Sequence, residues 1–187
     1  MQSLKYYKIY QDAKDPFFAT KNSACFDLSA YLPPTIPVKV YTRDNTPIHR
    51  DPVVGEDSFL LIYPGERALI PTGLILDIPT GYSVRLHVRS SMALKQGIAL
   101  ANSEGVIDSD YVEPTFVMLY NSSTSTVHIL NGERICQGEL VSMMDYTLDR
   151  IYAKPGSKTD RVGGFGDRKS TRLNSSHSQQ SRMPSSA

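Results

Sequence analysis

The chain is poor in cysteine. Only two cysteines occur among 187 residues, Cys25 and Cys136, and neither belongs to a CxxC pair or a Cys/His cluster in the sequence. This spacing favours neither a structural zinc site nor a disulfide framework. We therefore expect a protein of a reducing compartment.

Long apolar runs and net charge are also lacking. No run approaches the roughly 20 apolar residues of a membrane helix, and the polar N-terminus has no apolar stretch typical of a signal peptide. The 20 Lys and Arg residues nearly balance 19 Asp and Glu, so a net charge of +1 gives no broad field for nucleic acid or anionic lipid. We expect no nucleic-acid or membrane partner and a cytoplasmic location, or a host-intracellular one if the chain is viral.

The length suits one domain, which we place at residues 1–167. Residues 168–187 contain seven serines, four basic residues, no acid and no aromatic ring, a composition that cannot build a core. We predict a disordered tail there. Its segment STRLNSSHS resembles translated adaptor or vector sequence, and a natural tail is the alternative.

Short alternating segments dominate the rest. In GYSVRLHV, residues 81–88, apolar side chains alternate with polar ones, which is typical of a half-buried strand. Further extended runs cover residues 4–10, 59–63, 68–79, 116–121 and 126–130. Turn residues separate them, so we predict an all-β fold, a distorted jelly roll or β-clip barrel.

One short helix is predicted at residues 90–96, SSMALKQ. Its serines are placed to cap the first turn and Gly97 to end it. Residues 33–57 are polar and rich in proline, and we interpret them as an insertion or extended hairpin outside the core.

Three segments have charged side chains at predicted turns or at the ends of predicted elements. Arg89 precedes the helix start, where backbone N–H groups favour an anion, although an ordinary cap beside a solvated arginine would look the same. RVGGFG, residues 161–166, combines an arginine that can bind phosphate, glycines that allow close backbone approach and a ring that can stack. The alternative is a flexible terminus. In GVIDSDY, residues 105–111, two aspartates follow an apolar run. They would supply carboxylates to a site, or they simply end a strand, where aspartate is common.

Five segments follow one another in a familiar order. They are ACFDLSA at 24–30, RSSMA at 89–93, NSEGVIDSDY at 102–111, GERICQ at 132–137 and RVGGFG at 161–166. In order and spacing the chain closely resembles the trimeric dUTP diphosphatases (dUTPases), from about Leu4 to Gly166 apart from the insertion. The resemblance implies hydrolysis of dUTP to dUMP and pyrophosphate by a homotrimer with three shared sites.

The resemblance also implies catalytic and nucleoside-binding residues. Asp108 matches the carboxylate that deprotonates the water attacking the α-phosphorus, and Gln137 is its expected catalytic companion. Tyr111 matches the residue packed under the deoxyribose, where a 2′-hydroxyl would collide. The hairpin of residues 101–111 matches the element that receives uracil along its backbone, through Asn102, Gly105, Val106 and Ile107.

Other matching positions would bind the triphosphate and close the site. They are Arg89, Ser90, Ser91, Arg134, Arg161, Gly164, Phe165 and Gly166. Phe165 would stack on uracil. Mg²⁺ would be held mainly by phosphates and water, and Asp27 would contact it through a water molecule. The alternative for Asp27 is a buried turn residue without a metal role. We interpret Asp110 as a structural carboxylate that holds the hairpin, and His87 as a surface residue.

Departures from the family pattern leave two alternatives. Asp167 stands where the family has small hydroxyl residues that bind the γ-phosphate, which favours a catalytically impaired dUTP-binding or regulatory protein. The related dCTP deaminases form the second alternative. Met118 occupies the position of their catalytic glutamate and Leu94 that of their arginine, so this alternative is disfavoured.

Overall fold

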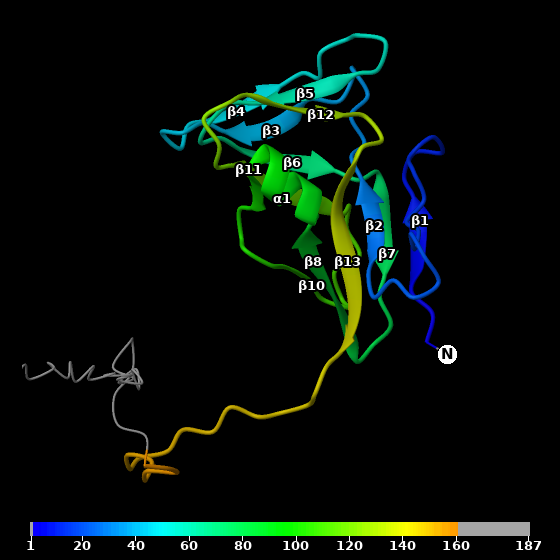
Figure 1. The fold of residues 1–187 in the computed structure, drawn as a ribbon. Coiled ribbons are helices and arrows are strands. Elements are labelled where there is room, and N and C mark those ends of the chain that lie inside the picture. Colours follow the sequence, from blue (N-terminus) through cyan, green and yellow to red (C-terminus); the bar gives the residue numbers. More distant parts are fainter. Residues whose placement is uncertain (1, 161–187) are drawn as a thin grey trace, which may run out of the picture. The chain divides into compact units, whose positions relative to one another are not determined.

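The computed structural model describes residues 2–160 (Figure 1), and the chain divides into two compact units, Met1–Asp145 and Tyr146–Ala187. The described part of the second unit, residues 146–160, is exposed and contains no strand or helix. Among the described residues, every strand and the helix belong to the first unit. None of the described helices is long and apolar enough to span a membrane.

Thirteen strands and one helix form the first unit. The strands are β1 (Lys5–Lys8), β2 (Phe26–Ser29), β3 (Val38–Tyr41), β4 (Pro47–Arg50), β5 (Phe59–Ile62), β6 (Arg67–Pro71), β7 (Leu74–Asp77), β8 (Tyr82–Val88), β9 (Ile98–Leu100), β10 (Gly105–Ile107), β11 (Phe116–Asn121), β12 (Val127–Leu130) and β13 (Arg134–Ser142). The helix α1 spans Ser90–Gln96, as predicted.

The strands form antiparallel sheets. One has the order β10-β8-β13-β2, a second has the order β4-β3-β6-β11-β9, and two further pairs are β1-β7 and β12-β5. The longest strand, β13, lies between β2 and β8 (Figure 1). The predicted all-β class, jelly-roll-like with one short helix, is confirmed.

Alternating side chains build the core. On β8, Val84 and Leu86 are buried, while Tyr82 and Val88 pack against the core at its edge, as the sequence pattern predicted. Ser83 departs from the pattern because it is buried too. A single contiguous cluster of buried residues, nearly all aliphatic, therefore holds both large sheets together.

The predicted insertion does form a hairpin, of β3 and β4. The prediction that it lies outside the core is wrong, because Val38 and Val40 are 1% and 0% exposed. The physical reason is that β3 also pairs with β6, which carries its apolar face into the second sheet.

A buried ion pair fixes this hairpin to the rest of the sheet. Arg50 Nη1 and Nη2 donate to the two carboxylate oxygens of Glu66 at 2.6 and 2.9 Å, and Nη1 also donates to the Leu61 carbonyl at 2.7 Å. Burial acts to raise the pKa of Glu66, but the hydrogen bonds from Arg50 and the Tyr63 N–H outweigh it and hold that pKa below its ordinary value.

The helix end was predicted well and its start was not. Gly97 adopts φ 66°, and its N–H donates to the Met92 carbonyl, which is the expected αL end. At the start, however, the cap residue is Arg89, and no side chain caps the first turn. The serines lie inside the helix, so their hydroxyls stay free for another partner.

Candidate active site

Two arginines converge on one buried carboxylate. Asp27 lies on β2 with 3% exposure, and its Oδ2 accepts a hydrogen bond from Arg134 Nη1 at 3.0 Å. Arg89 Nε lies 3.6 Å from Oδ1 of the same carboxylate, and its Nη1 donates to the Arg134 carbonyl. Two guanidinium groups share one carboxylate, so the cluster keeps one net positive charge for an outside anion.

Polar donors surround this cluster. Ser90 and Ser91 are exposed on the first turn of α1, directly after Arg89. Gln137 lies between Asp27 on β2 and His87 on β8 in the register of the sheet. Five of the residues predicted to bind phosphate or assist catalysis, together with Asp27, are thus brought together by β2, β8, α1 and β13.

One carboxylate oxygen of Asp27 lacks a hydrogen-bond partner among the described residues. Its Oδ1 is buried and accepts no hydrogen bond from a described residue. The carboxylate is already balanced by two arginines, so direct ligation of Mg²⁺ would compete with both of them. The alternative of a turn residue bonded to backbone is wrong for its carboxylate, which lies on a strand and bonds to Arg134.

The segment predicted as a uracil-binding hairpin has a different structure. β9 pairs with β11 and β10 pairs with β8, so the two strands belong to different sheets and do not form a hairpin. Each of the two strands ends its sheet and pairs with a described strand along one edge only, and Asn102 to Glu104 form a tight turn between the sheets. Gly105 is needed there, since a Cβ would lie 2.8 Å from Leu86 Cβ.

The predicted nucleoside-binding residues lie along this connection. Val106 is 49% exposed between the buried Gly105 and Ile107, so one side of β10 is open. Tyr111 is 43% exposed, and its hydroxyl donates to the Pro114 carbonyl at 3.1 Å, which fixes the ring. Asn102 is exposed at the turn.

Asp108 follows β10 with its side chain exposed. Its carboxylate makes no hydrogen bond or ion pair within the described part of the chain, while its carbonyl accepts from the Tyr111 N–H. Asp110 is likewise exposed and its carboxylate makes no hydrogen bond there, so the structural role predicted for Asp110 is not observed.

Within one chain, Asp108 does not meet the arginine cluster. Ile107 pairs with Val84, which places Asp108 beside Ser83 on β8. Arg89 lies six residues further along, a separation of about 20 Å at the rise of an extended chain. The predicted catalytic carboxylate and the predicted phosphate-binding residues are therefore two separate groups on one protomer.

The last predicted segment lies outside the described residues. Arg161, Gly164, Phe165 and Gly166 all fall there, as does the departure at Asp167. The predicted tail of residues 168–187 does so as well.

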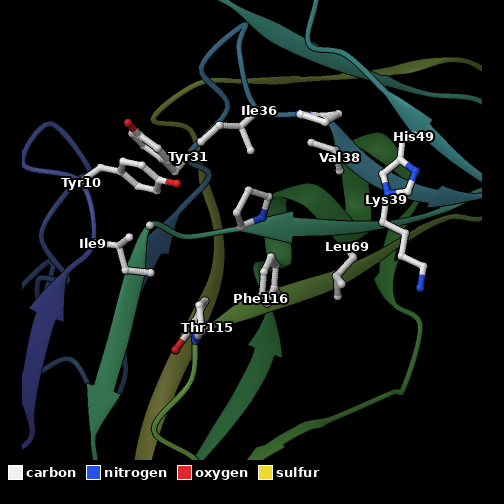
Figure 2. Close-up of a pocket in the computed structure, with 14 residues that line it drawn as sticks. Ile9, Tyr10, Tyr31, Ile36, Val38, Lys39, His49, Leu69, Thr115 and Phe116 are labelled. Carbon is white, nitrogen blue, oxygen red and sulfur yellow. The ribbon is translucent and has the colours of Figure 1, made fainter.

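One partly enclosed hollow lies away from these groups. Figure 2 shows this space of about 320 Å³, with the stacked rings of Tyr10 and Tyr31 at one end and Lys39 and His49 at the other. Burial, followed by the hydrogen bond to Asp12, raises the pKa of Tyr31 to about 12. None of the described residues predicted for the site lines this cavity, and we assign it no role in catalysis.

A second hollow of about 320 Å³ does include a predicted residue. Asn102 lines it with Ala101, Met118 and, from the predicted insertion, Lys39 and Tyr41. This proximity could not be predicted from the sequence, because β3 reaches Asn102 only through its pairing with β6 and the pairing of β6 with β11.

The fold is all-β, and the cluster of Arg89, Arg134 and Asp27 has a net positive charge that favours binding of an anion. A family model described as dUTPase matches residues 56–166, which is more than half of the chain. The chain belongs to the dUTPase family.

Individual relatives agree. The deoxyuridine 5′-triphosphate nucleotidohydrolase of Hydrogenobaculum sp. is 34% identical over 160 residues, covering 85% of this chain and 92% of that protein. The enzyme of the same name from Brucella melitensis is 40% identical over 113 residues, covering 60% and 71%. The crystal structure of dUTPase from Streptococcus mutans has a TM-score of 0.60 at 25% identity, covering 78% and 99%.

Proposed function

We propose that this chain hydrolyses dUTP to dUMP and pyrophosphate, and that each active site is built from two or more copies in a homotrimer. Family membership supports the reaction. The single observation that carries the shared site is the separation of Asp108 from the arginine cluster within one chain, because neither group can complete the reaction alone. A second copy can supply the missing half.

In the proposed reaction, Asp108 of one copy orients a water molecule and accepts its proton. The water oxygen forms a bond to the α-phosphorus, the bond from that phosphorus to the oxygen bridging the α- and β-phosphates breaks, and pyrophosphate leaves. Arg89, Ser90, Ser91, Arg134 and Gln137 of another copy bind the phosphates and stabilise the charge that develops on them.

Mg²⁺ is part of this proposal. A solved dUTPase from phage phi11 of S. aureus, 16% identical to this chain, contains a structural Mg(II) ion. In this chain the phosphates and water would provide most ligands, and Asp27, whose Oδ1 is buried but accepts no hydrogen bond from a described residue, would bond one of these waters. The ion would neutralise phosphate charge during the reaction.

Specificity would depend on the open side of β10 and on Tyr111. In this proposal, backbone groups on the unpaired edge of β10 beside Val106 would pair with uracil, and the Tyr111 ring, whose hydroxyl donates to the Pro114 carbonyl, would exclude a 2′-hydroxyl. We further propose that Arg161 and Phe165 close over the bound nucleotide, and that the enzyme works in the cytoplasm, or in a host cell if viral.

Pyrophosphate release with Mg²⁺ from dUTP, dCTP, dTTP and UTP tests this function. We expect kcat/KM for dUTP to exceed that for each other nucleotide by at least about 100-fold, because each of the others adds a clash or an unpaired polar group. UTP hydrolysed as fast as dUTP would contradict the role of Tyr111. Tight dUTP binding without any turnover would instead establish the alternative, an impaired binding or regulatory protein.

A further inference from the structure

A group of possible metal ligands lies outside the residues assigned above. The ligand atoms of Cys25, His87 and Glu139 all lie within 4.8 Å of one another, and each side chain is partly exposed. The sequence did not reveal this group, because its members come from the residue before β2, from β8 and from β13.

The sheet register explains why these side chains meet. Gly138 on β13 lies opposite both Phe26 on β2 and Leu86 on β8. One residue along from these positions, Glu139, Cys25 and His87 project from the other face of the sheet, away from the buried Phe26 and Leu86. Three strands thus bring three donors to one place.

The imidazole of His87 lies between two carboxylates. Its Nε2 lies 3.4 Å from Glu139 Oε2, inside the group, while its Nδ1 lies 3.9 Å from Glu104 Oε1 on the opposite side. A carboxylate on the far ring nitrogen fixes the tautomer and increases the basicity of the nitrogen that binds a metal. Glu104, at 3.9 Å, lies on that side of the ring but beyond hydrogen-bond distance, and a small movement of its side chain would bring it into this role.

We propose that Cys25, His87 and Glu139 bind one Zn²⁺ or a similar thiophilic divalent cation per chain. Thiolate, imidazole and carboxylate are the donors that zinc takes in tetrahedral sites, with water or a further donor in the fourth position. Mg²⁺ and Ca²⁺ prefer oxygen alone, so the thiol and the imidazole select against them.

Neighbouring charges favour a cation. Arg85 is the one described cation placed opposite Glu139 in the register, and its guanidinium lies 3.7 Å from Glu104. The two carboxylates of Glu104 and Glu139 therefore outnumber the one arginine of this group. A protonated His87 paired with both glutamates is the competing explanation, and it requires no metal.

The proposed site adjoins the phosphate-binding group but uses none of its residues. Cys25 precedes Asp27 by two residues, and His87 lies opposite Gln137. A cation there would join β2 to β13 and β8. The inference goes beyond dUTP hydrolysis, and its test needs no nucleotide.

The test is titration of the metal-free full-length protein with Co²⁺ and then Zn²⁺, followed by absorption spectroscopy. We expect one Co²⁺ per chain with a thiolate charge-transfer band in the near ultraviolet and visible bands of tetrahedral Co²⁺, both abolished by one equivalent of Zn²⁺. Cys136 is fully buried, so the band would report Cys25.

Single variants identify the ligands. Cys25→Ser should abolish the charge-transfer band, and His87→Gln and Glu139→Gln should each weaken Zn²⁺ binding by at least about tenfold. His128→Gln and Glu56→Gln, both at exposed positions outside the group, should bind as wild type. Circular dichroism checks that each variant folds. Absence of binding to wild type, or equal binding by Cys25→Ser, would overturn the proposal in favour of the His87 ion pair.

Discussion

Replacing Asp108 by Asn is expected to lower kcat for dUTP by a factor of roughly 100 to 10,000 and to leave dUTP binding within about threefold of wild type. The amide keeps the shape of the carboxylate but cannot accept the proton of water. Since no described residue bonds to the Asp108 side chain, the substitution disturbs nothing else in the protomer. Steady-state turnover and isothermal titration with a non-hydrolysable dUTP analogue measure the two quantities.

Asp110 offers a matched control. It is an exposed aspartate two residues away whose carboxylate makes no hydrogen bond within the described residues. Asp110→Asn removes the same charge from the same segment, and its kcat should stay within about threefold of wild type. If both variants lost turnover equally, the loss would reflect the charge of the segment and the base would be wrongly assigned.

Replacing Arg50 by Ala is expected to reduce the free energy of unfolding by about 3–5 kcal/mol at neutral pH. The substitution leaves the Glu66 carboxylate, which is 5% exposed, without its two hydrogen bonds from the guanidinium. Arg43→Ala, at an exposed position of the same hairpin, should change stability by no more than about 0.5 kcal/mol. Urea denaturation followed by circular dichroism makes the comparison.

The effect of Arg50→Ala should depend on pH in a defined direction. Glu66 has a lowered pKa in the folded protein, so it stabilises the fold above the ordinary carboxyl pKa of about 4.5, and this stabilisation is lost as the pH falls. The difference between wild type and Arg50→Ala should therefore shrink below about pH 4.5. A constant difference from pH 7 to pH 3 would show that the stabilisation by Arg50 does not depend on the charge of Glu66.

Strands were predicted where apolar side chains form an alternating or a continuous run, and β5 lies within one residue of its predicted run 59–63. β8, β11 and β12 fall where the pattern placed them, within one residue. β13, the longest strand, was not predicted, because Gly138 breaks its alternation. That glycine is required by tertiary packing, since a Cβ would lie 2.3 Å from the Phe26 ring, and no single-sequence pattern contains that distance.

The sequence predicted which residues belong to the candidate site. It did not predict which of them lie together in one chain. Local motifs identified Asp27, Arg89 and Arg134, and the structure brings all three together. The paired hairpin expected around Asn102 was wrong, because β9 and β10 each pair with a different strand, β11 and β8, and not with one another. For the same reason the contact of Cys25 with His87 and Glu139 could not be predicted from spacing.

Mixing two inactive variants tests the central claim of a site shared between chains. Asp108→Asn and Arg89→Ala should each be inactive alone, one lacking the proton acceptor and the other a phosphate-binding arginine. After the two are unfolded together in equal amounts and refolded, roughly one quarter of the sites should combine a native Asp108 with a native Arg89 from another copy. We predict recovery of about that fraction of wild-type turnover, whereas a mixture as inactive as its components would contradict the shared site.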